Sequence, residues 1–260
     1  TGRGLGLPLF SLITYNCNGL SAYPKGTLST KRRWAKMRLI KSFISEYDVV
    51  MLQETKLNAL EDKYLNFDGY KTFYSNKDDK HAGVATIIGP KMLKNYAPTL
   101  IKSSRGTCGN VLQIRMRSKN HHQRDFTIDN LYLKSGTDMK AKKAQLEALV
   151  HGADDTVFMG GDFNFTEREE DGGARIGGKA SEFWSDLCQK LGLAEVYQGS
   201  HTFSRPGYSS RIDRIYCNLN EADRSLYYPT AYVKASDAAD IKQVGETSRP
   251  VSFLTIIQCP

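Results

Sequence analysis

The stretch Val157–Phe165, VFMGGDFNF, decides what fold we expect from this chain. Its three apolar residues, Val157 to Met159, are typical of a short buried strand. Two glycines follow, and they allow either a backbone turn or the close approach of another group. Asp162 and Asn164 are two positions apart, so in an extended segment their side chains point to the same face. The stretch therefore predicts a buried strand that delivers a carboxylate and a carboxamide to one spot.

Similar apolar runs recur along the chain and alternate with segments of helical periodicity. The other strand-like runs are Phe10–Thr14, Val49–Leu52, Gly83–Ile88, Val111–Ile114, Phe126–Leu133, Ile212–Tyr216 and Val251–Ile257. The helical segments are Arg33–Tyr47, Lys140–His151 and Ala180–Leu191. Strands interleaved with helices, together with consecutive hairpin-like strands, predict a layered α/β domain. Because we find no repeat and no linker-like tract, we expect residues 1–260 to form a single domain.

The segment Arg33–Tyr47 has an apolar stripe at helical spacing. The stripe consists of Trp34, Met37, Ile40, Ile44 and Tyr47, and it leaves Lys36, Arg38 and Lys41 for the solvent side.

The composition and charge narrow the class of protein. Hydrophobic residues make up 40% of the chain, which allows a sizeable core, and no apolar run approaches a membrane span. The five cysteines are scattered and form no CxxC pair, which argues against a disulfide framework or a zinc site. This pattern fits a reducing intracellular compartment such as the nucleus. The net charge of +8 is explained either by solubility or by an anionic partner, with nucleic acid first.

Polar residues repeatedly stand where an apolar run ends. These residues are Asn16 and Asn18, Gln53 and Glu54, Tyr132, Asp162 and Asn164, and Asp213 within SSRIDRI. A single Asn or Asp at such a position usually makes a turn. Five such positions of complementary chemistry favour a functional site, because layered α/β proteins place their chemistry in loops at strand ends.

These residue types suit the metal-dependent hydrolysis of a phosphate ester. Glu54 offers a hard oxygen ligand, and Asn16 or Asn18 adds a neutral oxygen. Such a set leaves room for water and phosphate around Mg²⁺ (or Mn²⁺).

The remaining members of the set suit the attack of a water molecule. Asp162 is a candidate base for that water, and Asn164 can donate an amide hydrogen to a phosphoryl oxygen. Tyr132 can donate to the same developing charge.

Four segments resemble, in this order, the motifs of the endonuclease/exonuclease/phosphatase superfamily. They are YNCNGL (15–20), LQET (52–55), GGDFN (160–164) and SRIDRI (210–215). The superfamily includes DNase I-like nucleases, abasic-site endonucleases and the endonucleases of LINE-type retrotransposons. The resemblance extends from about residue 10 to residue 240. It implies a four-layer sandwich in which two mixed β-sheets pack face to face and are flanked by helices.

The resemblance also implies one metal-dependent site at the sheet edges. Its members would be Asn16 and Glu54 for the metal, Asn18 beside them as a contact to nucleic acid, Tyr132 for the phosphate, Asp162 for the water, Asn164 for the transition state and Asp213 as an organising residue.

One motif of the superfamily is incomplete in this chain. The superfamily closes with Ser-Asp-His, in which the aspartate orients a histidine that meets the scissile phosphate. Here Ser236 and Asp237 are followed by Ala238. In an alternative register, residues 246–248 (ETS) take the place of Ser-Asp-His before RPV. All five histidines precede residue 202, so the expected catalytic histidine is absent in both registers.

The missing histidine has two possible origins. A His→Ala substitution that inactivates a nuclease is favoured, because the other motif positions are intact. The alternative is a natural pseudoenzyme that has kept the fold for binding nucleic acid.

Basic and aromatic residues near the motifs suggest the substrate. Basic residues gather in 25–41, including Lys31, Arg32 and Arg33, and in a second cluster formed by Arg115, Arg117, Lys119 and Arg124. A solvated helix face explains the first cluster equally well, but its position beside the first motif favours phosphate contact. In segment 202–211, the residues that can stack on or insert beside bases are Phe203, Arg205, Tyr208 and Arg211. The glycine-rich segment Arg168–Lys179 can lie along a groove.

We therefore expect a nucleic-acid partner, DNA ahead of RNA, and no membrane partner. The SRIDRI stretch and the compact size resemble the retrotransposon type most closely. An RNA nuclease or a phosphoester phosphatase of the same superfamily remains an alternative. We expect the chain to act as a monomer or as one domain of a larger protein.

Overall fold

The computed structural model describes residues 6–7, 9–20, 27–76, 82–104, 110–136, 139–152, 154–172 and 178–227. The elements, in chain order, are β1 (Leu12–Asn16), α1 (Thr27–Glu46), β2 (Val49–Gln53), η1 (Asp62–Leu65), β3 (Lys71–Ser75), β4 (Val84–Ile88), α2 (Pro90–Asn95), β5 (Tyr96–Ser103), β6 (Val111–Ser118), β7 (Phe126–Tyr132), α3 (Met139–Glu147), β8 (Val157–Asp162), η2 (Glu169–Asp171), α4 (Gly178–Leu191), β9 (Ala194–Glu195), β10 (Phe203–Arg205), β11 (Tyr208–Ser210), β12 (Asp213–Cys217) and α5 (Glu221–Tyr227).

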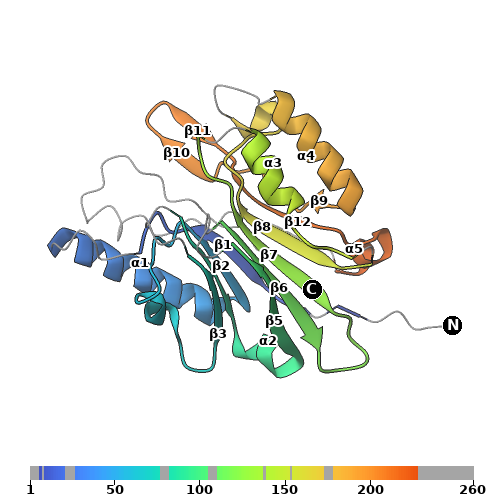
Figure 1. The fold of residues 1–260 in the computed structure, drawn as a ribbon, viewed down its shortest axis with the longest axis horizontal. Coiled ribbons are helices and arrows are strands. Elements are labelled where there is room, and N and C mark those ends of the chain that lie inside the picture. Colours follow the sequence, from blue (N-terminus) through green and yellow to red (C-terminus); the bar gives the residue numbers. More distant parts are fainter. Residues whose placement is uncertain are drawn as a thin grey trace.

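Two β-sheets and their helices form four layers, as predicted (Figure 1). One sheet has the strand order β1-β2-β4-β3 and the other β5-β6-β7-β8-β12-β9, while β10 and β11 form a separate hairpin. Buried side chains from both sheets meet between them, including Met51, Ile114 and Phe158. Helix α1 covers the outer face of the four-stranded sheet, and α3 and α4 cover the outer face of the six-stranded sheet.

The strand registers place the predicted site residues at one end of the sandwich. Strand β8 runs parallel to β7 and antiparallel to β12. Tyr132 therefore lies opposite Asp162, and Asp162 lies opposite Asp213. In the other sheet, β1 runs parallel to β2, so Asn16 lies opposite Gln53 and one residue from Glu54. The site thus draws on both sheets.

Gly160 and Gly161 allow two neighbouring segments to approach β8 closely, one on each side. A Cβ on Gly160 would lie 2.5 Å from the Cε of Met51, which comes from the opposite sheet. Gly161 has φ +145°, and a Cβ there would lie 1.9 Å from the carbonyl oxygen of Leu131 in β7. The glycines therefore allow β8 to pack tightly against both the facing sheet and its neighbouring strand.

A buried polar network joins the two sheets directly below the site. The Nε2 of Gln53 donates to the Oδ1 of Asn130 at 2.8 Å, and the Nδ2 of Asn130 donates to the carbonyl of Ala85 at 2.8 Å. Thr14 donates to the Oε1 of Gln53 at 3.1 Å. Gln53 is therefore a core residue rather than a member of the site, and a fully satisfied network of this kind fixes one sheet against the other.

Several details of the predicted elements were wrong. Helix α1 begins at Thr27, and Trp34 is 58% exposed rather than facing the core. Lys36, expected in solvent, donates to the carbonyls of Asn18 and Gly19 at 3.1 and 3.2 Å. The prediction missed β3, β5, β9, β10, β11, α2 and α5, and Val251–Ile257 lies outside the described residues.

None of the helices in the described ranges combines the length and the apolar character needed to cross a membrane.

Candidate active site

A carboxamide from one sheet joins carboxylates from both sheets. The Nδ2 of Asn16 donates to the Oε1 of Glu54 at 3.0 Å and to the Oδ2 of Asp162 at 2.8 Å. Asn16 and Glu54 stand at the ends of β1 and β2, while Asp162 ends β8. Segments separated by 146 residues therefore converge on one point.

Tyr132 and Asp213 complete the floor of this site. Tyr132 is 4% exposed, and its hydroxyl hydrogen-bonds with Glu54. Asp213 is 1% exposed, and within the described residues its carboxylate oxygens make no hydrogen bond of ordinary geometry, although the nearby Thr202 hydroxyl acts to lower its pKa. A buried carboxylate without such hydrogen bonds is costly, so Asp213 favours either a proton or a cation close by.

The carboxylates of the site have different proton affinities. Burial raises the pKa of Asp162 to about 7; the Glu54 charge adds to this effect, and the Asn16 hydrogen bond opposes it. Burial and the neighbouring Asp162 charge raise the pKa of Asp213 well above its usual range. Burial also acts to raise the pKa of Glu54, but hydrogen bonds from Asn16 and Lys56 outweigh it and the pKa is lowered. The site thus keeps one carboxylate ionised beside two that hold protons more readily.

The backbone of the site loops is strained. Asn18, Glu54, Lys56 and Asn164 have φ between 44° and 52°, and no other non-glycine residue in the described ranges has a positive φ. Asn tolerates this left-handed region, whereas Glu and Lys adopt it rarely. Such strain persists only where the surroundings hold it, and it concentrates at functional sites.

Lysines missed by the sequence reasoning border the site. The Nζ of Lys56 lies 2.9 Å from the Oε2 of Glu54 and donates to the Oδ1 of Asn18 at 3.1 Å. Lys142 of α3 is 3% exposed and donates to the carbonyl of Asn164 at 2.7 Å. Lys56 directly follows the LQET motif, which is a usable signal, but Lys142 stands among other lysines without any distinguishing pattern.

The oxygen atoms that the site offers are of the kind that binds a hard divalent cation. Within the described ranges, no group of three or more His, Cys, Asp or Glu residues is arranged to hold a metal ion. Glu54 and the buried Asp213 nevertheless offer carboxylate oxygens, and Asn16 offers a neutral oxygen. The Lys56 ammonium already contacts Glu54 as a cation would. Oxygen ligands of this kind are those that Mg²⁺ prefers.

The sequence matches the Endonuclease/Exonuclease/phosphatase family over residues 13–237. The chain belongs to this family. The match ends one residue before Ala238. No match exists among curated proteins.

Solved structures show the fold of the family over nearly the whole chain. The endonuclease domain of TRAS1, a telomere-specific non-LTR retrotransposon, has a TM-score of 0.62 at 16% identity, with 97% of this chain and 99% of that chain covered. The catalytic domain of Xenopus laevis APE2 has a TM-score of 0.65 at 14% identity, covering 95% and 91%. An AP endonuclease from Archaeoglobus fulgidus has a TM-score of 0.65 at 15% identity, covering 96% and 99%.

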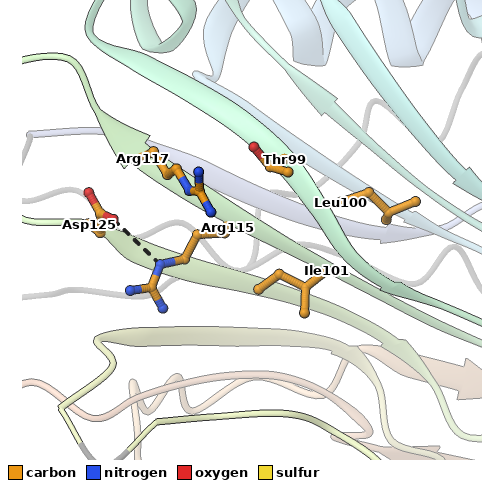
Figure 2. A pocket seen from close by; sticks show the side chains of 6 residues that line it. All are labelled: Thr99, Leu100, Ile101, Arg115, Arg117 and Asp125. Carbon is orange, nitrogen blue, oxygen red and sulfur yellow. Dashed lines mark ion pairs between the residues drawn. The ribbon is translucent and has the colours of Figure 1, made fainter.

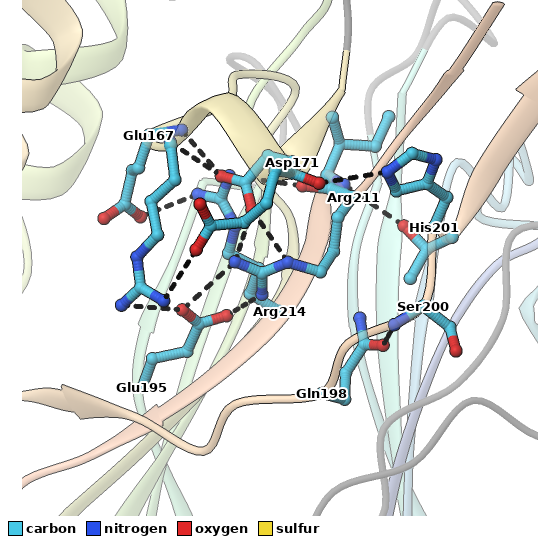
Figure 3. Close-up of polar contacts among 12 residues, drawn as sticks. Glu167, Asp171, Glu195, Gln198, Ser200, His201, Arg211 and Arg214 are labelled. Atoms are coloured by element: carbon cyan, nitrogen blue, oxygen red, sulfur yellow. Dashed lines mark hydrogen bonds and ion pairs between the residues drawn. The ribbon is translucent and has the colours of Figure 1, made fainter.

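Arg211 of the family's SRIDRI motif is not available to nucleic acid. It is 1% exposed, and its Nε and Nη2 donate to the Oδ1 of Asp171 at 2.8 and 2.5 Å, while its Nη1 pairs with Glu195 (Figure 3). Arg214 also binds Asp171, through Nη2 at 3.0 Å. The prediction that Arg211 contacts DNA was therefore wrong, because buried acidic partners fully engage its guanidinium.

The same network explains the neighbouring loop. Asp171 accepts hydrogen bonds from the backbone of Glu167 and Arg168, so the start of the glycine-rich segment is tied to SRIDRI. His201 contacts Ser209 through Nδ1 at 2.6 Å and the carbonyl of Glu170 through Nε2 at 3.1 Å, which supports a structural role. Residues 173–177 lie outside the described ranges.

Half of the second basic cluster is engaged in ion pairs, and the cluster lies away from the site. Arg115 pairs with Asp125 (Figure 2) and with Asp155. Arg124 pairs with Asp223. Arg115 and Arg117 line a pocket beside β5, towards the end of β6 opposite to Val111. Because Val111 pairs with Leu131 at the site end of β7, this cluster faces the remote end of the sheet.

The other residues predicted to contact nucleic acid differ in their exposure and in their contacts. Phe203 and Tyr208 face each other across the β10–β11 hairpin, with ring centroids 6.0 Å apart. Lys31 is exposed, whereas the Arg33 guanidinium stacks 3.7 Å from the centre of the Tyr64 ring. The side chains of Arg32 and Arg205, and the whole of Asp237 and Ala238, lie outside what the structure describes.

Proposed function

We propose that this chain is a Mg²⁺- or Mn²⁺-dependent phosphodiester hydrolase that cuts DNA, in a form that lacks the catalytic histidine. The observation that carries the proposal is the Asn16 amide, which joins Glu54 to Asp162 across the two sheets. That contact unites the residue assigned to the metal with the residue assigned to the water. The positive net charge of +8 supports an anionic polymer as the substrate.

The residues divide the work of hydrolysis among them. Glu54 and Asn16 would hold the metal, which when bound supplies positive charge against the phosphate oxygens. Asp162, with a pKa near 7, is suited to accept a proton from the attacking water near neutral pH. Tyr132 and Asn164 would donate hydrogen bonds to the charge that develops on the phosphoryl oxygens. Asp213, which lies opposite Asp162 in the neighbouring strand, would help to hold the orientation of the Asp162 carboxylate.

The position of Ala238 removes one contact from this scheme. The methyl group of Ala238 can neither accept the orienting contact of Asp237 nor donate a proton to the phosphate, so we expect strongly impaired turnover. We favour a His→Ala substitution in an otherwise intact nuclease, because Asn16, Glu54 and Asp162 keep their mutual hydrogen bonds. The second candidate is a nucleic-acid-binding pseudoenzyme.

Restoring the histidine tests the proposal. We expect the Ala238→His protein to nick supercoiled plasmid when Mg²⁺ is present, to stop on chelation, and to leave 3′-hydroxyl ends. Ala238→His combined with Asp162→Asn is the control for a contaminating nuclease and should be inactive. Ser248→His tests the alternative register in the same assay. Background turnover in both histidine variants, with DNA binding retained, would establish the pseudoenzyme.

The type of DNA target follows from a parallel measurement. TRAS1 is described as a telomere-specific retrotransposon and another neighbour as an AP endonuclease, so both target classes are open for this chain. We favour the retrotransposon class. Preferential nicking of a duplex with an abasic site would move the assignment to repair, and preferential cleavage of RNA would replace DNA as the substrate.

A further inference from the structure

Lys142 is a buried cation that the proposed chemistry does not use. It lies in α3, in the outer helical layer, and yet it is only 3% exposed. Its Nζ donates to the carbonyl oxygen of Asn164 at 2.7 Å, the one hydrogen bond of its ammonium among described residues. Burial lowers the pKa of Lys142, and the nearby Asp162 charge opposes this effect. Burying an ammonium costs free energy, so its placement calls for a compensating role.

The residue that accepts this hydrogen bond has a strained backbone. Asn164 has φ +49°, in the left-handed region. Its own N–H donates to the Oδ1 of Asp162 at 2.9 Å. The backbone of Asn164 is thus held at both polar groups, by Asp162 on the amide and by Lys142 on the carbonyl. These two contacts restrain the backbone from which the Asn164 side chain projects.

We propose that Lys142 is a positioning residue for the nuclease reaction, which fixes the left-handed turn of Asn164 through its carbonyl and so sets the geometry between Asn164 and Asp162. The inference rests on the proposed function for its catalytic consequence, but its structural part stands independently of it. The side chain reaches the turn from α3 and also passes over Phe165, with Nζ 5.8 Å from the ring centre. A flexible lysine held by packing and a charge-assisted hydrogen bond is suited to such a support.

The neighbouring lysine supplies a matched control. Lys143 is half-exposed, and its Nζ lies 3.6 Å from the Oε1 of Glu147 on the same helix and 5.4 Å from the ring centre of Phe183, so its contacts differ from those of Lys142. Lys142→Met keeps the length and apolar stem and removes the hydrogen bond. Lys142→Arg keeps the charge and a donor. Lys143→Met makes the same chemical change at a surface position.

The experiment combines amide exchange with kinetics. We expect about tenfold faster exchange of the Asn164 amide in Lys142→Met, because the lost bond is charge-assisted, with little change in Lys143→Met. In the Ala238→His background, kcat should fall about 100-fold with KM nearly unchanged, since a misplaced group affects the chemical step. Lys142→Arg should recover part of both. If Lys142→Met folds poorly, Lys142→Gln is scored by the same criteria.

The salt dependence of DNA binding separates positioning from direct contact. A positioning residue leaves the slope of log affinity against log salt unchanged, whereas a phosphate contact lowers it by about 0.9. A lowered slope in Lys142→Met would overturn the positioning role, and so would unchanged Asn164 exchange. If the Ala238→His protein does not nick at all, the proposed function fails, but the exchange measurement still decides whether Lys142 holds the turn.

Discussion

The carboxamide of Asn16 stands between two carboxylates that would otherwise face each other. Its one Nδ2 atom serves both Glu54 and Asp162, while its Oδ1 accepts the Asn18 amide at 2.9 Å. Asn16 therefore reduces repulsion within the site and at the same time orients both acids. An aspartate at this position would add a third negative charge and donate nothing.

Asn16→Ala should lower nicking by the Ala238→His protein about 10- to 100-fold. A hydrogen bond to a charged group contributes about 1.5–3 kcal/mol, and each 1.4 kcal/mol is a factor of ten. Plasmid-nicking rates at saturating Mg²⁺ measure the effect. Asn95→Ala, exposed at the end of α2, is the control and should retain full activity. Equal rates for the two variants would remove Asn16 from the site.

His151, which stands shortly before the GGDFN motif in the sequence, makes a second buried polar contact. Its Nε2 lies 3.1 Å from the Oδ2 of Asp129, whose Oδ1 accepts a hydrogen bond from Gln113 at 3.0 Å. Burial acts to lower the pKa of His151, but the hydrogen bond and charge of Asp129, with a contribution from Asp155, outweigh it and raise the pKa above its usual value.

This raised pKa predicts a pH dependence of stability. The folded state holds the His151 proton more tightly than the unfolded chain, so the stabilisation is complete below about pH 6.5 and is lost as the pH rises through the folded pKa. The urea-unfolding free energy should therefore fall more steeply above about pH 6.5 in the native protein than in His151→Gln. Exposed His121 gives the control variant, His121→Gln. Parallel curves for native protein and His151→Gln would exclude the linkage.

At the scale of elements, buried ion pairs fasten the β12 strand to its surroundings. Arg211 and Arg214 share Asp171 of η2, and Arg211 also holds Glu195 of β9. These contacts connect elements that are not neighbours in the chain. Asp213 lies between these two arginines in the sequence and begins β12. The anchor thereby fixes the strand end on which the site depends.

Arg211→Met should destabilise the protein by about 3–5 kcal/mol, because Asp171 and Glu195 would stay buried without this partner. Chemical denaturation measures the loss, and Arg117→Met, at an exposed arginine, should change stability by less than about 0.5 kcal/mol. DNA affinity per folded molecule should be unchanged. A stable Arg211→Met protein with weakened, less salt-dependent DNA binding would restore the phosphate-contact role.

The elements also show which features the sequence can predict. Strand β8 was predictable because its residues are buried on both faces and read as an apolar run. Strand β5 was missed because it lies at a sheet edge, has exposed side chains at half of its residues and contains a bulge after Leu100. Asp171, the buried partner of Arg211, is 40 residues away in the sequence, and no local sequence pattern predicts such a pairing. Lys142 likewise differs from Lys143 only through tertiary packing.

At the scale of the whole molecule, the candidate active site lies at one end of the sandwich, and helix α2 lies at the other end. The site lies where β1, β2, β7 and β8 finish. Helix α2 lies at the opposite end, because it follows Ile88, which pairs with Val49 at the start of β2. Basic residues occur at both ends, so the net charge of +8 does not by itself locate a DNA-binding face.

Two triple variants of equal charge decide where DNA binds. Neutralising Lys31, Arg32 and Arg33 near the start of α1, each to Gln, removes three positive charges beside the loop that Lys36 ties to the site. Neutralising Lys91, Lys94 and Lys119 near α2 removes the same charge from the far end.

Affinity for a DNA duplex should fall steeply between about 50 and 200 mM salt in the native protein, and each lost phosphate contact reduces the slope of log affinity against log salt by about 0.9. We expect the α1 triple to lower the slope by about 1–2, since Arg33 is partly engaged by Tyr64, and the α2 triple to leave it unchanged. Equal slopes in both triples would mean that bulk charge, rather than a face next to the site, attracts the DNA.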